Sequence, residues 1–323
     1  MRRKFWVFAI LALFLVCATS AAAQQGFPTR PVRLLIPYAA GGAVDILGRT
    51  LGDELSKRWK QPVVIENRTG AGGTIASAVV AKAAPDGYTL VIVASGHSIN
   101  PYLYQNLPYD TFKDLKPISL LGSSPNMMMV ASNSPLKSVA DVLATARAKP
   151  GSLSYGMSGI GTSTHLAGEL FKYMAKVDIV AVSYKGGAPI INDLLGGHLP
   201  LSFNNIPESI GQIKGGNLRP LGVTSAKRSA VLPDVPPIAE SGVPGYDTFV
   251  WWGMIGPGAL PADLTAKISK DCAEALHAPA VKQRLDNLGA VVAGSSPAEF
   301  EKLIRADYEK WGPVIKAAGI KGE

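Results

Sequence analysis

Residues 32–60 read VRLLIPYAAGGAVDILGRTLGDELSKRWK, and this stretch indicates the fold of the whole chain. The apolar run at its start, Val32–Pro37, predicts a buried strand. From Val44 to Lys60, apolar side chains recur three or four residues apart, which predicts an amphipathic helix. A glycine-rich loop, Tyr38–Gly42, joins the two. Strand, loop and helix in this order are the repeating unit of an α/β fold.

The same alternation continues along the chain. Further strands are expected at 63–66, 89–94, 127–131, 152–157, 179–183, 201–203 and 218–224, and helices at 74–83, 138–148, 164–174 and 189–195. Three more helices, at 262–276, 281–288 and 297–317, are expected to close the chain. This order predicts an α/β fold with largely parallel sheets.

Two segments rich in proline and glycine, 122–125 and 232–245, are expected to carry the chain between two lobes. We therefore predict a first lobe of residues 27–124 plus 248–323 and an inserted second lobe of residues 125–247. Two crossings of this kind make a hinge, and ligand sites favour the cleft between two lobes.

The first 23 residues have the pattern of a secretory signal peptide. Basic residues at Arg2–Lys4 precede an apolar run at Phe5–Ala18, and small residues follow at Ala21–Ala23. We expect cleavage after this segment and a soluble, periplasmic mature protein. Two alternatives stay open. In the first, the apolar run anchors the chain in the membrane, although it is short for a span. In the second, Cys17 carries a lipid.

The composition argues against several classes of protein. Removal of residues 1–23 lowers the formal net charge from +8 to +5, a modest surplus that favours small anionic ligands. The sequence has no basic stripe typical of nucleic-acid binding and no Gly-Lys-Ser/Thr phosphate loop. Its four histidines lack ligand-like spacing, so we predict no metal and no cofactor. Cys272 is the only cysteine after residue 23, which leaves it no disulfide partner.

Three loops rich in glycine and hydroxyl residues each precede a predicted helix: Tyr38–Gly42, Thr69–Thr74 and Ser158–Thr164. Glycine lets the backbone approach a ligand closely, and the free N–H groups at a helix N-terminus attract anions. We therefore expect loops from both lobes to hold a carboxylate between them. The alternative is that the glycines only make turns and the hydroxyls only cap helices.

Two histidines are candidates for function. A pair of Ser158 with His165 would suit hydrolysis, but the glycine spacing around Ser158 is not that of a nucleophile elbow and no third group is assignable. We therefore predict a binding protein rather than an enzyme. His97 follows a predicted strand at its C-terminal end, where α/β sheets present ligand-facing groups, so we include it in the cleft.

A series of segments matches a known family in order and spacing. They are Ile36–Asp45, Glu66–Gly73, Pro85–Leu90, His97–Pro101, Ser154–Gly156 with Gly161–Leu166, Ser183–Gly187, and Leu232–Pro236 with Ala239–Gly242. In them the chain resembles the receptors of tripartite tricarboxylate transporters, the Bug or TctC-like family. The resemblance implies a class II periplasmic binding protein fold that closes on a small organic carboxylate. It also implies delivery of this ligand to the membrane permease subunits.

The resemblance also implies ligand contacts on both lobes. In the first lobe these are Tyr38, Gly41, Gly42, Thr74 and Ser95, with Asp45 either touching the ligand or stabilising the first helix; in the second they are Ser158, Gly161, Thr162 and Ser163, with Tyr184 and Lys185 nearby. We expect a monomer. A receptor that passes the same ligand to a sensor protein is the alternative that the sequence leaves open.

One position departs from the family pattern. Where members commonly have Phe-Asp-Asn-Leu-Pro-Ser, residues 203–208 read FNNIPE, so Asn204 replaces an aspartate. Asparagine donates and accepts hydrogen bonds but offers no negative charge to a cationic amine. If Asn204 faces the cleft, we expect a dicarboxylate, a hydroxy acid or an aromatic acid as the ligand rather than an amino acid.

Overall fold

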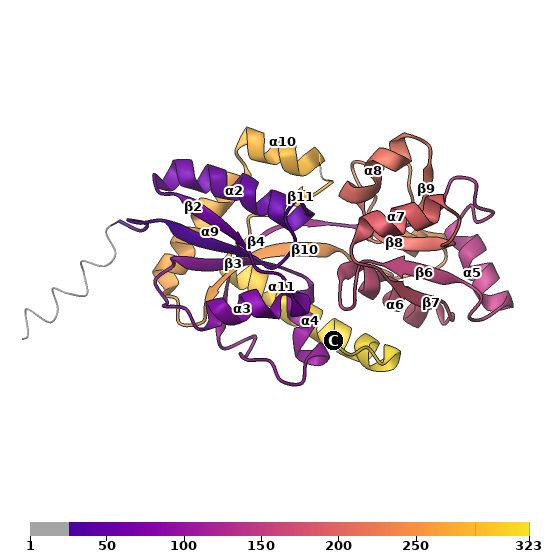
Figure 1. The fold of residues 1–323 in the computed structure, drawn as a ribbon, viewed down its shortest axis with the longest axis horizontal. Helices are drawn as coiled ribbons and strands as arrows, with labels where there is room; N and C mark the ends of the chain where they lie inside the picture. The colour runs from indigo at the N-terminus through magenta and orange to yellow at the C-terminus, as the bar shows by residue number, and fades with distance from the viewer. Residues whose placement is uncertain (1–25, 288, 323) are drawn as a thin grey trace, which may run out of the picture.

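The computed structural model describes residues 26–287 and 289–322. Two α/β halves lie side by side, each built on one β-sheet flanked by helices (Figure 1). The expected signal peptide at residues 1–23, including Cys17, lies outside the described residues. Within the described part, no helix combines the length and the apolar character that a membrane span requires.

The first half holds a six-stranded sheet with the strand order β11-β4-β10-β3-β1-β2. Its strands are β1 (Val32–Ile36), β2 (Val63–Asn67), β3 (Thr89–Ala94), β4 (Leu115–Ser124), β10 (Val250–Pro257) and β11 (Val291–Val292). Its helices are α2 (Ala43–Trp59), α3 (Thr74–Ala81), α4 (Gly96–Leu103), α9 (Ala262–Leu276), α10 (Pro279–Asn287) and α11 (Pro297–Ala318). Strands β2 and β3 pair in parallel with β1, whereas β10 runs antiparallel to β3 and β4.

The second half holds a five-stranded sheet with the order β7-β6-β8-β5-β9. Its strands are β5 (Asn126–Ala131), β6 (Ser154–Met157), β7 (Val180–Ser183), β8 (Leu201–Asn205) and β9 (Leu218–Val223), and its helices are α5 (Val139–Ala148), α6 (Ser163–Ala175), α7 (Gly187–Leu195) and α8 (Ile206–Lys214). Strand β6 is parallel to β7 and β8, but β5 is antiparallel to β8 and β9. The predicted two-part α/β fold is confirmed, although each sheet is mixed rather than largely parallel.

The strands that link the two halves, β4 and β10, are absent from the sequence prediction. Strand β4 ends at Ser124 and β5 begins at Asn126, so a single residue separates the two sheets. The chain returns to the first sheet through β10, which pairs with β4 over its whole length. All eight residues of β10 are buried, so its sequence shows no alternation of polar and apolar side chains. On this basis we propose lobes of residues 27–124 plus 248–323 and of residues 125–247.

The C-terminal helix α11 reaches from the first lobe to the second. It begins with the expected capping box: Ser296 Oγ accepts from the Glu299 N–H at 3.3 Å, and Glu299 Oε2 accepts from the Ser296 N–H at 2.9 Å. Phe300 packs in a core cluster of the first lobe, whereas Trp311 and Ile315 pack in a cluster built largely from second-lobe residues. The helix therefore bridges both lobes, instead of belonging wholly to the first.

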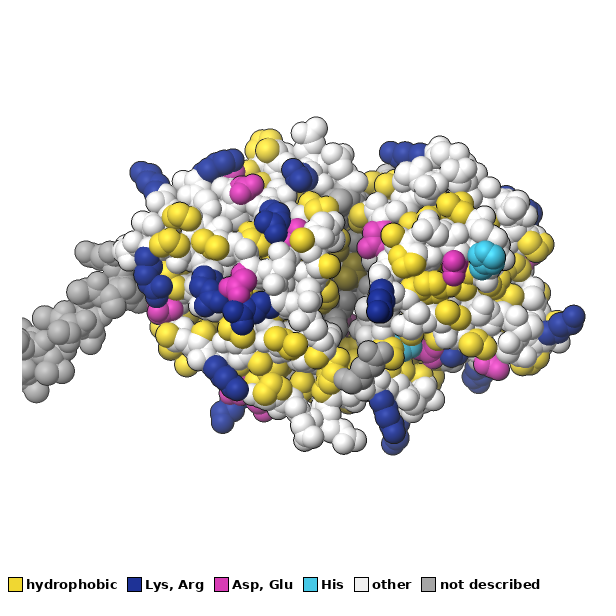
Figure 2. Space-filling view, in the orientation of Figure 1, with side chains coloured by type: hydrophobic (Ala, Val, Ile, Leu, Met, Phe, Trp, Pro, Cys, Tyr) yellow, Lys and Arg dark blue, Asp and Glu magenta, His cyan; other side chains and the backbone are white. Residues whose placement is uncertain are grey.

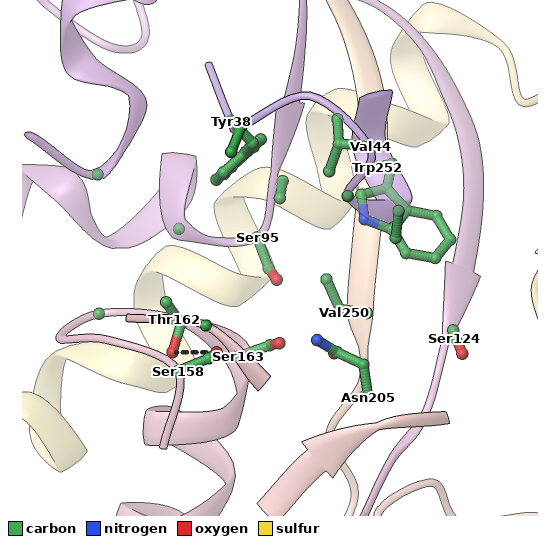
Figure 3. A pocket seen from close by; sticks show the side chains of 18 of the residues that line it. Tyr38, Val44, Ser95, Ser124, Ser158, Thr162, Ser163, Asn205, Val250 and Trp252 are labelled. Atoms are coloured by element: carbon green, nitrogen blue, oxygen red, sulfur yellow. Dashed lines mark hydrogen bonds between the residues drawn. The ribbon is translucent and has the colours of Figure 1, made fainter. Parts of the chain in front are cut away.

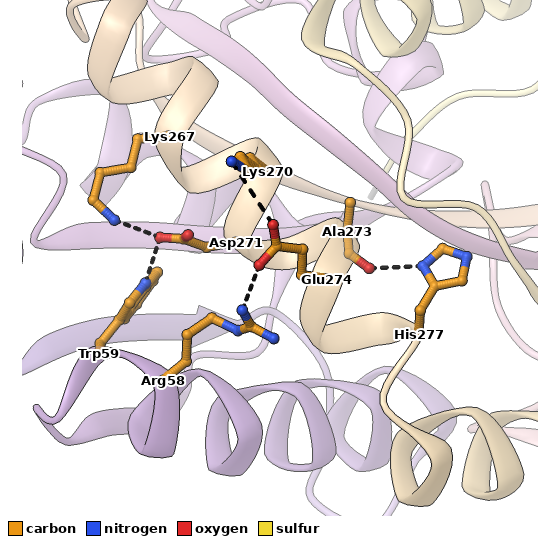
Figure 4. Close-up of polar contacts among 8 residues, drawn as sticks. All are labelled: Arg58, Trp59, Lys267, Lys270, Asp271, Ala273, Glu274 and His277. Carbon is orange, nitrogen blue, oxygen red and sulfur yellow. Dashed lines mark hydrogen bonds and ion pairs between the residues drawn. The ribbon is translucent and has the colours of Figure 1, made fainter.

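Polar contacts attach α9 to the C-terminal end of α2 (Figure 4). The Trp59 indole N–H donates to Asp271 Oδ2 at 2.7 Å, and Lys267 Nζ contacts the same carboxylate oxygen at 2.7 Å. Arg58 forms an ion pair with Glu274 one turn further along α9. These contacts hold the far end of α2 in place, so that its N-terminus points in a fixed direction.

Gly253, in β10, provides a test of the packing between this strand and α11. A Cβ added there would lie 1.9 Å from Phe300 Cζ, so alanine cannot fit without moving the ring. We expect Gly253→Ala to lower the free energy of unfolding by about 1–3 kcal/mol in urea denaturation.

The clash predicts that Gly253→Ala and Phe300→Leu are less destabilising together than the sum of their separate effects. Gly211→Ala, on α8, is the control, because no atom lies within 4 Å of its added Cβ. Fully additive effects of the first pair would contradict the proposed contact.

Candidate functional site

A cavity of about 280 Å³ lies between the two lobes. Figure 2 shows the groove between them, and Figure 3 shows side chains that face the cavity. Predicted residues on its wall are Tyr38, Gly42, Ser95, Ser158, Gly161, Thr162 and Ser163; further wall residues include Gly72, Gly96, Asn100, Ser124, Gly186, Asn205, Glu208, Val250 and Trp252. The structure thus brings together seven of the predicted residues, drawn from both lobes.

Tyr38 and Gly42 reach the wall from the loop between β1 and α2, but Gly41 does not. Gly41 has a φ of +82°, a conformation that favours glycine, and its N–H donates to Asp45 Oδ2 at 2.9 Å. Burial raises the pKa of Tyr38 to about 12, so its phenol stays protonated and can donate a hydrogen bond. Gly41 therefore shapes the turn, while its neighbours form the surface.

Asp45 does not line the cavity; it is buried behind the loop that does. Its carboxylate accepts from the Gly41 N–H, from Arg49 Nε at 2.9 Å and from Asn67 Nδ2 at 2.8 Å. Asn67 Nδ2 also donates to the Tyr38 carbonyl at 3.0 Å. Burial acts to raise the pKa of Asp45, but these hydrogen bonds outweigh it and hold the pKa below its ordinary value. The geometry favours a structural role over ligand contact, and the carboxylate holds the loop before the first helix as well as the Arg49 side chain on that helix.

The second-lobe loop places three hydroxyls beside one another. Ser158 Oγ lies 2.8 Å from Thr164 Oγ1, and Thr162 Oγ1, the N-cap of α6, donates to the Gly159 carbonyl at 2.7 Å. Thr162 therefore both caps α6 and lines the cavity. The side chain of Ser163, the first residue of α6, points into the cavity (Figure 3).

Gly161 marks the closest approach of the second-lobe loop to the first lobe. A Cβ added there would lie 2.5 Å from Leu103 Cδ1 on α4, and the φ of Gly161 is +72°. Both facts require glycine at this position. The loop can therefore reach across to α4 and close one side of the cavity.

Ser95 gives the clearest sign that the cavity accepts a polar ligand. It is 3% exposed, and its hydroxyl has no hydrogen-bond partner within the described part of the chain. In Figure 3 this hydroxyl points toward the same space as Ser163 and Asn205. A buried hydroxyl without a partner costs free energy, so a ligand that accepts its hydrogen bond gains from the site.

Five predicted contacts besides Asp45 and Gly41 are not on the wall. Thr74 begins α3, and Gly72 in the preceding turn reaches the cavity instead. The Tyr184 hydroxyl donates to Asp193 Oδ2 at 2.7 Å, and Lys185 is exposed. The second-lobe backbone reaches the wall one residue later, at Gly186.

His97, the fourth, is buried within α4 and does not face the cavity. Burial lowers its pKa to about 4, so the ring is neutral near pH 7. Its position after β3 correctly indicated the edge of the sheet. The preceding residues Ser95 and Gly96 line the cavity instead, because α4 begins there.

Asn204 is fully buried and also lies off the wall. Its Oδ1 accepts from the Asn205 N–H at 2.9 Å. Because Asn204 does not line the cavity, its side chain gives no reason to disfavour a cationic ligand. The next residues along, Asn205 and Glu208, line the cavity, and the sequence prediction missed them. The feature of the sequence that could have identified them is the helix that begins directly after β8.

The N-termini of five helices meet at the cavity. Ala43 begins α2, Gly96 begins α4 and Ser163 begins α6, while Gly186 and Asn205 directly precede α7 and α8. Each terminus carries free N–H groups and a partial positive charge. Among the wall residues described, none is Lys or Arg, so these termini and the hydroxyls are the groups available to an anion.

The geometry does not assemble the serine–histidine pair considered for hydrolysis. Ser158 Oγ bonds to Thr164 and Thr162, while His165 Nδ1 accepts from the Gly161 N–H at 3.1 Å. The imidazole nitrogen that faces this loop is thus engaged with the backbone. In this arrangement Ser158 serves as a hydrogen-bonding group rather than an activated nucleophile.

Two α/β lobes, with helix N-termini and hydroxyls facing a cavity between them, define a two-lobed solute-binding protein. The family model of the tripartite tricarboxylate transporter family receptor matches residues 47–320, and this chain belongs to that family. The Bug or TctC-like resemblance in its motifs is thereby confirmed.

Individual relatives agree. The chain is 31% identical to Protein BugT of Bordetella pertussis over 317 residues, which is 97% of each chain. It is also similar to two solved structures. R. palustris Rpa4515 with adipate is 38% identical, with a TM-score of 0.82 over 91% of this chain and 99% of that one. MatC from Rhodopseudomonas palustris with bound malate is 30% identical, with a TM-score of 0.79 over 90% and 99%.

The network around Asp45 predicts a large effect of its loss. We expect Asp45→Ala to lower the free energy of unfolding by about 2–3 kcal/mol, because it removes charged hydrogen bonds to the loop and leaves their donors unpaired. Asp53→Ala, at an exposed position of the same helix, is the control and should change it by less than about 0.5 kcal/mol. Equal effects of the two variants in urea denaturation would contradict the role assigned to Asp45.

Buried His97 predicts a pH dependence of stability. Its folded pKa of about 4 lies below the ordinary value of 6.5, so the unfolded chain binds a proton first as the pH falls. The contribution of neutral His97 to the free energy of unfolding is complete above pH 6.5 and declines toward pH 4, by roughly 3 kcal/mol in total. We expect His97→Gln to flatten the decline in urea-derived unfolding free energy between these pH values. A parallel decline in wild type and variant would rule this out.

Proposed function

We propose that this protein is an extracytoplasmic receptor that captures a small organic carboxylate between its lobes. We further propose that it delivers the ligand to the permease subunits of a tripartite tricarboxylate transporter. The observation that carries this proposal is the meeting of five helix N-termini with the unpaired Ser95 hydroxyl in one interlobe cavity. Such groups stabilise a carboxylate without a cationic side chain.

The comparisons support the class of ligand. Adipate is bound in Rpa4515 and malate in MatC, and both are small carboxylates. A cavity of about 280 Å³ suits a molecule of similar size. Dicarboxylates, hydroxy acids and aromatic acids all bring a carboxylate of the kind that the helix N-termini attract.

The proposed mechanism is capture and release, with no bond made or broken. Closure of the lobes would bury the ligand and exclude water around the donors, which strengthens each hydrogen bond to the carboxylate. We also propose that residues 1–23 direct export and are removed, and that the mature protein acts as a monomer in the periplasm. The family to which the chain belongs supports a permease as the partner.

Binding is testable with purified protein. We expect some members of a panel of small organic acids to raise the midpoint of thermal unfolding, because a ligand that binds the folded state stabilises it. For the best acid, Ser95→Ala should weaken binding roughly 10- to 100-fold in calorimetry, the value of a hydrogen bond to a charged group.

Ser152→Ala is the matched control, since this serine is exposed and lies outside the cavity. A panel without any stabilising acid, or an unchanged affinity in Ser95→Ala, would argue against the proposed site.

A further inference from the structure

Glu208 is the one Asp or Glu among the described residues that line the cavity. It lies in the first turn of α8, three residues after Asn205. A Cβ added to Gly187 would lie 1.8 Å from Glu208 Oε2 and 2.8 Å from Asn204 Oδ1. The carboxylate therefore occupies the space beside Gly187, at the N-terminus of α7.

Glu208 and the neighbouring Asn205 present hydrogen-bond acceptors to the cavity. Asn205 Oδ1 is buried and has no partner within residues 26–287 and 289–322, and Asn205 Nδ2 makes only a long contact of 3.5 Å with Glu208 Oε1. Glu208 has no ion pair with a described Lys or Arg. Burial raises the pKa of Glu208, with the Asn205 contact opposing the rise. The Glu208 side chain as a whole is nevertheless exposed, and its carboxylate has no compensating cation among the described residues.

The same cavity also presents hydrogen-bond donors. Ser95 and Ser163 point into it, and helices α2, α4 and α6 direct their N-termini there. A ligand carboxylate is most stable against these groups. The remainder of the ligand then extends toward Asn205 and Glu208. A second carboxylate in that place would meet a negative charge of the protein, whereas a hydroxyl or an amide N–H would donate to it.

We propose that Glu208 determines specificity by selecting monocarboxylates whose far end carries a hydrogen-bond donor and by rejecting dicarboxylates. This inference rests on the proposed function, because it assumes that a carboxylate binds at the Ser95 and Ser163 hydroxyls and the helix N-termini. Of the three ligand classes considered above it favours hydroxy acids, and it adds monoamides, which also carry a donor at the far end. A site that offers buried acceptors discriminates strongly against a ligand that cannot donate to them.

A structural role for Glu208 is the alternative. An acidic residue in the first turn stabilises a helix through the partial positive charge at its N-terminus. Glu299 has the same position in α11, where it forms the capping box with Ser296 outside the cavity. Glu299→Gln is therefore a matched control for the loss of a carboxylate from a helix N-terminus.

The experiment compares three probes of equal length in calorimetry: succinate, its monoamide succinamate, and butyrate, which lacks a polar far end. Adipate, adipamate and hexanoate repeat the comparison with a longer chain. We expect the wild-type protein to bind the monoamide at least about tenfold more tightly than the diacid at one length or both. Glu208→Gln should abolish or reverse this preference, because a neutral amide can donate to the second carboxylate. Glu299→Gln should retain it.

Two outcomes would overturn the inference while leaving the proposed function intact. One is a wild-type protein that binds the diacid as tightly as the monoamide. The other is a Glu208→Gln variant with a lower unfolding midpoint but an unchanged ratio of the two affinities, which is the result expected of a purely structural residue. If no probe or other organic acid binds the wild-type protein, the proposed function fails and this inference fails with it.

Discussion

The antiparallel pairing of β4 with β10 is the constraint on which the site depends. The pair runs from Leu115 opposite Pro257 to Ser124 opposite Val250, and it ends where the chain enters the second lobe. The same end contributes Ser124, Val250 and Trp252 to the cavity wall. The strands that join the lobes therefore also set where the two sets of ligand-facing loops can meet.

The cavity combines donors and acceptors without a cationic side chain on its described wall. Helix N-termini offer a diffuse positive potential that does not require the desolvation of a Lys or Arg, so an anion can be released again when the lobes open. Glu208 adds one carboxylate to the same described wall. A receptor that must both capture and release its ligand benefits from this arrangement, because several interactions of moderate strength together supply the binding free energy.

Local sequence patterns predicted much of this site. Tyr38, Gly42, Ser158, Gly161, Thr162 and Ser163 lie in glycine–hydroxyl loops, and all reach the wall because such loops end strands and begin helices at one sheet edge. Asp45, predicted from the family resemblance, His97, predicted from its place after a strand, and Asn204, which departs from the family pattern, all face inward. A shift of one residue turns a side chain from the cavity to the core, and periodicity alone does not resolve that shift.

The sequence by itself determined the α/β alternation, the helix starts and the glycines at which backbone must approach backbone, because these depend on short-range sterics and hydrogen bonding. The tertiary structure decided which strands join the lobes, since the apolar run of β10 does not show that it pairs with β4. It also decided that α11 packs on both lobes and that Glu208, beside Gly187, is the acid in the cavity. These features depend on contacts between segments far apart in the chain, which no local pattern contains.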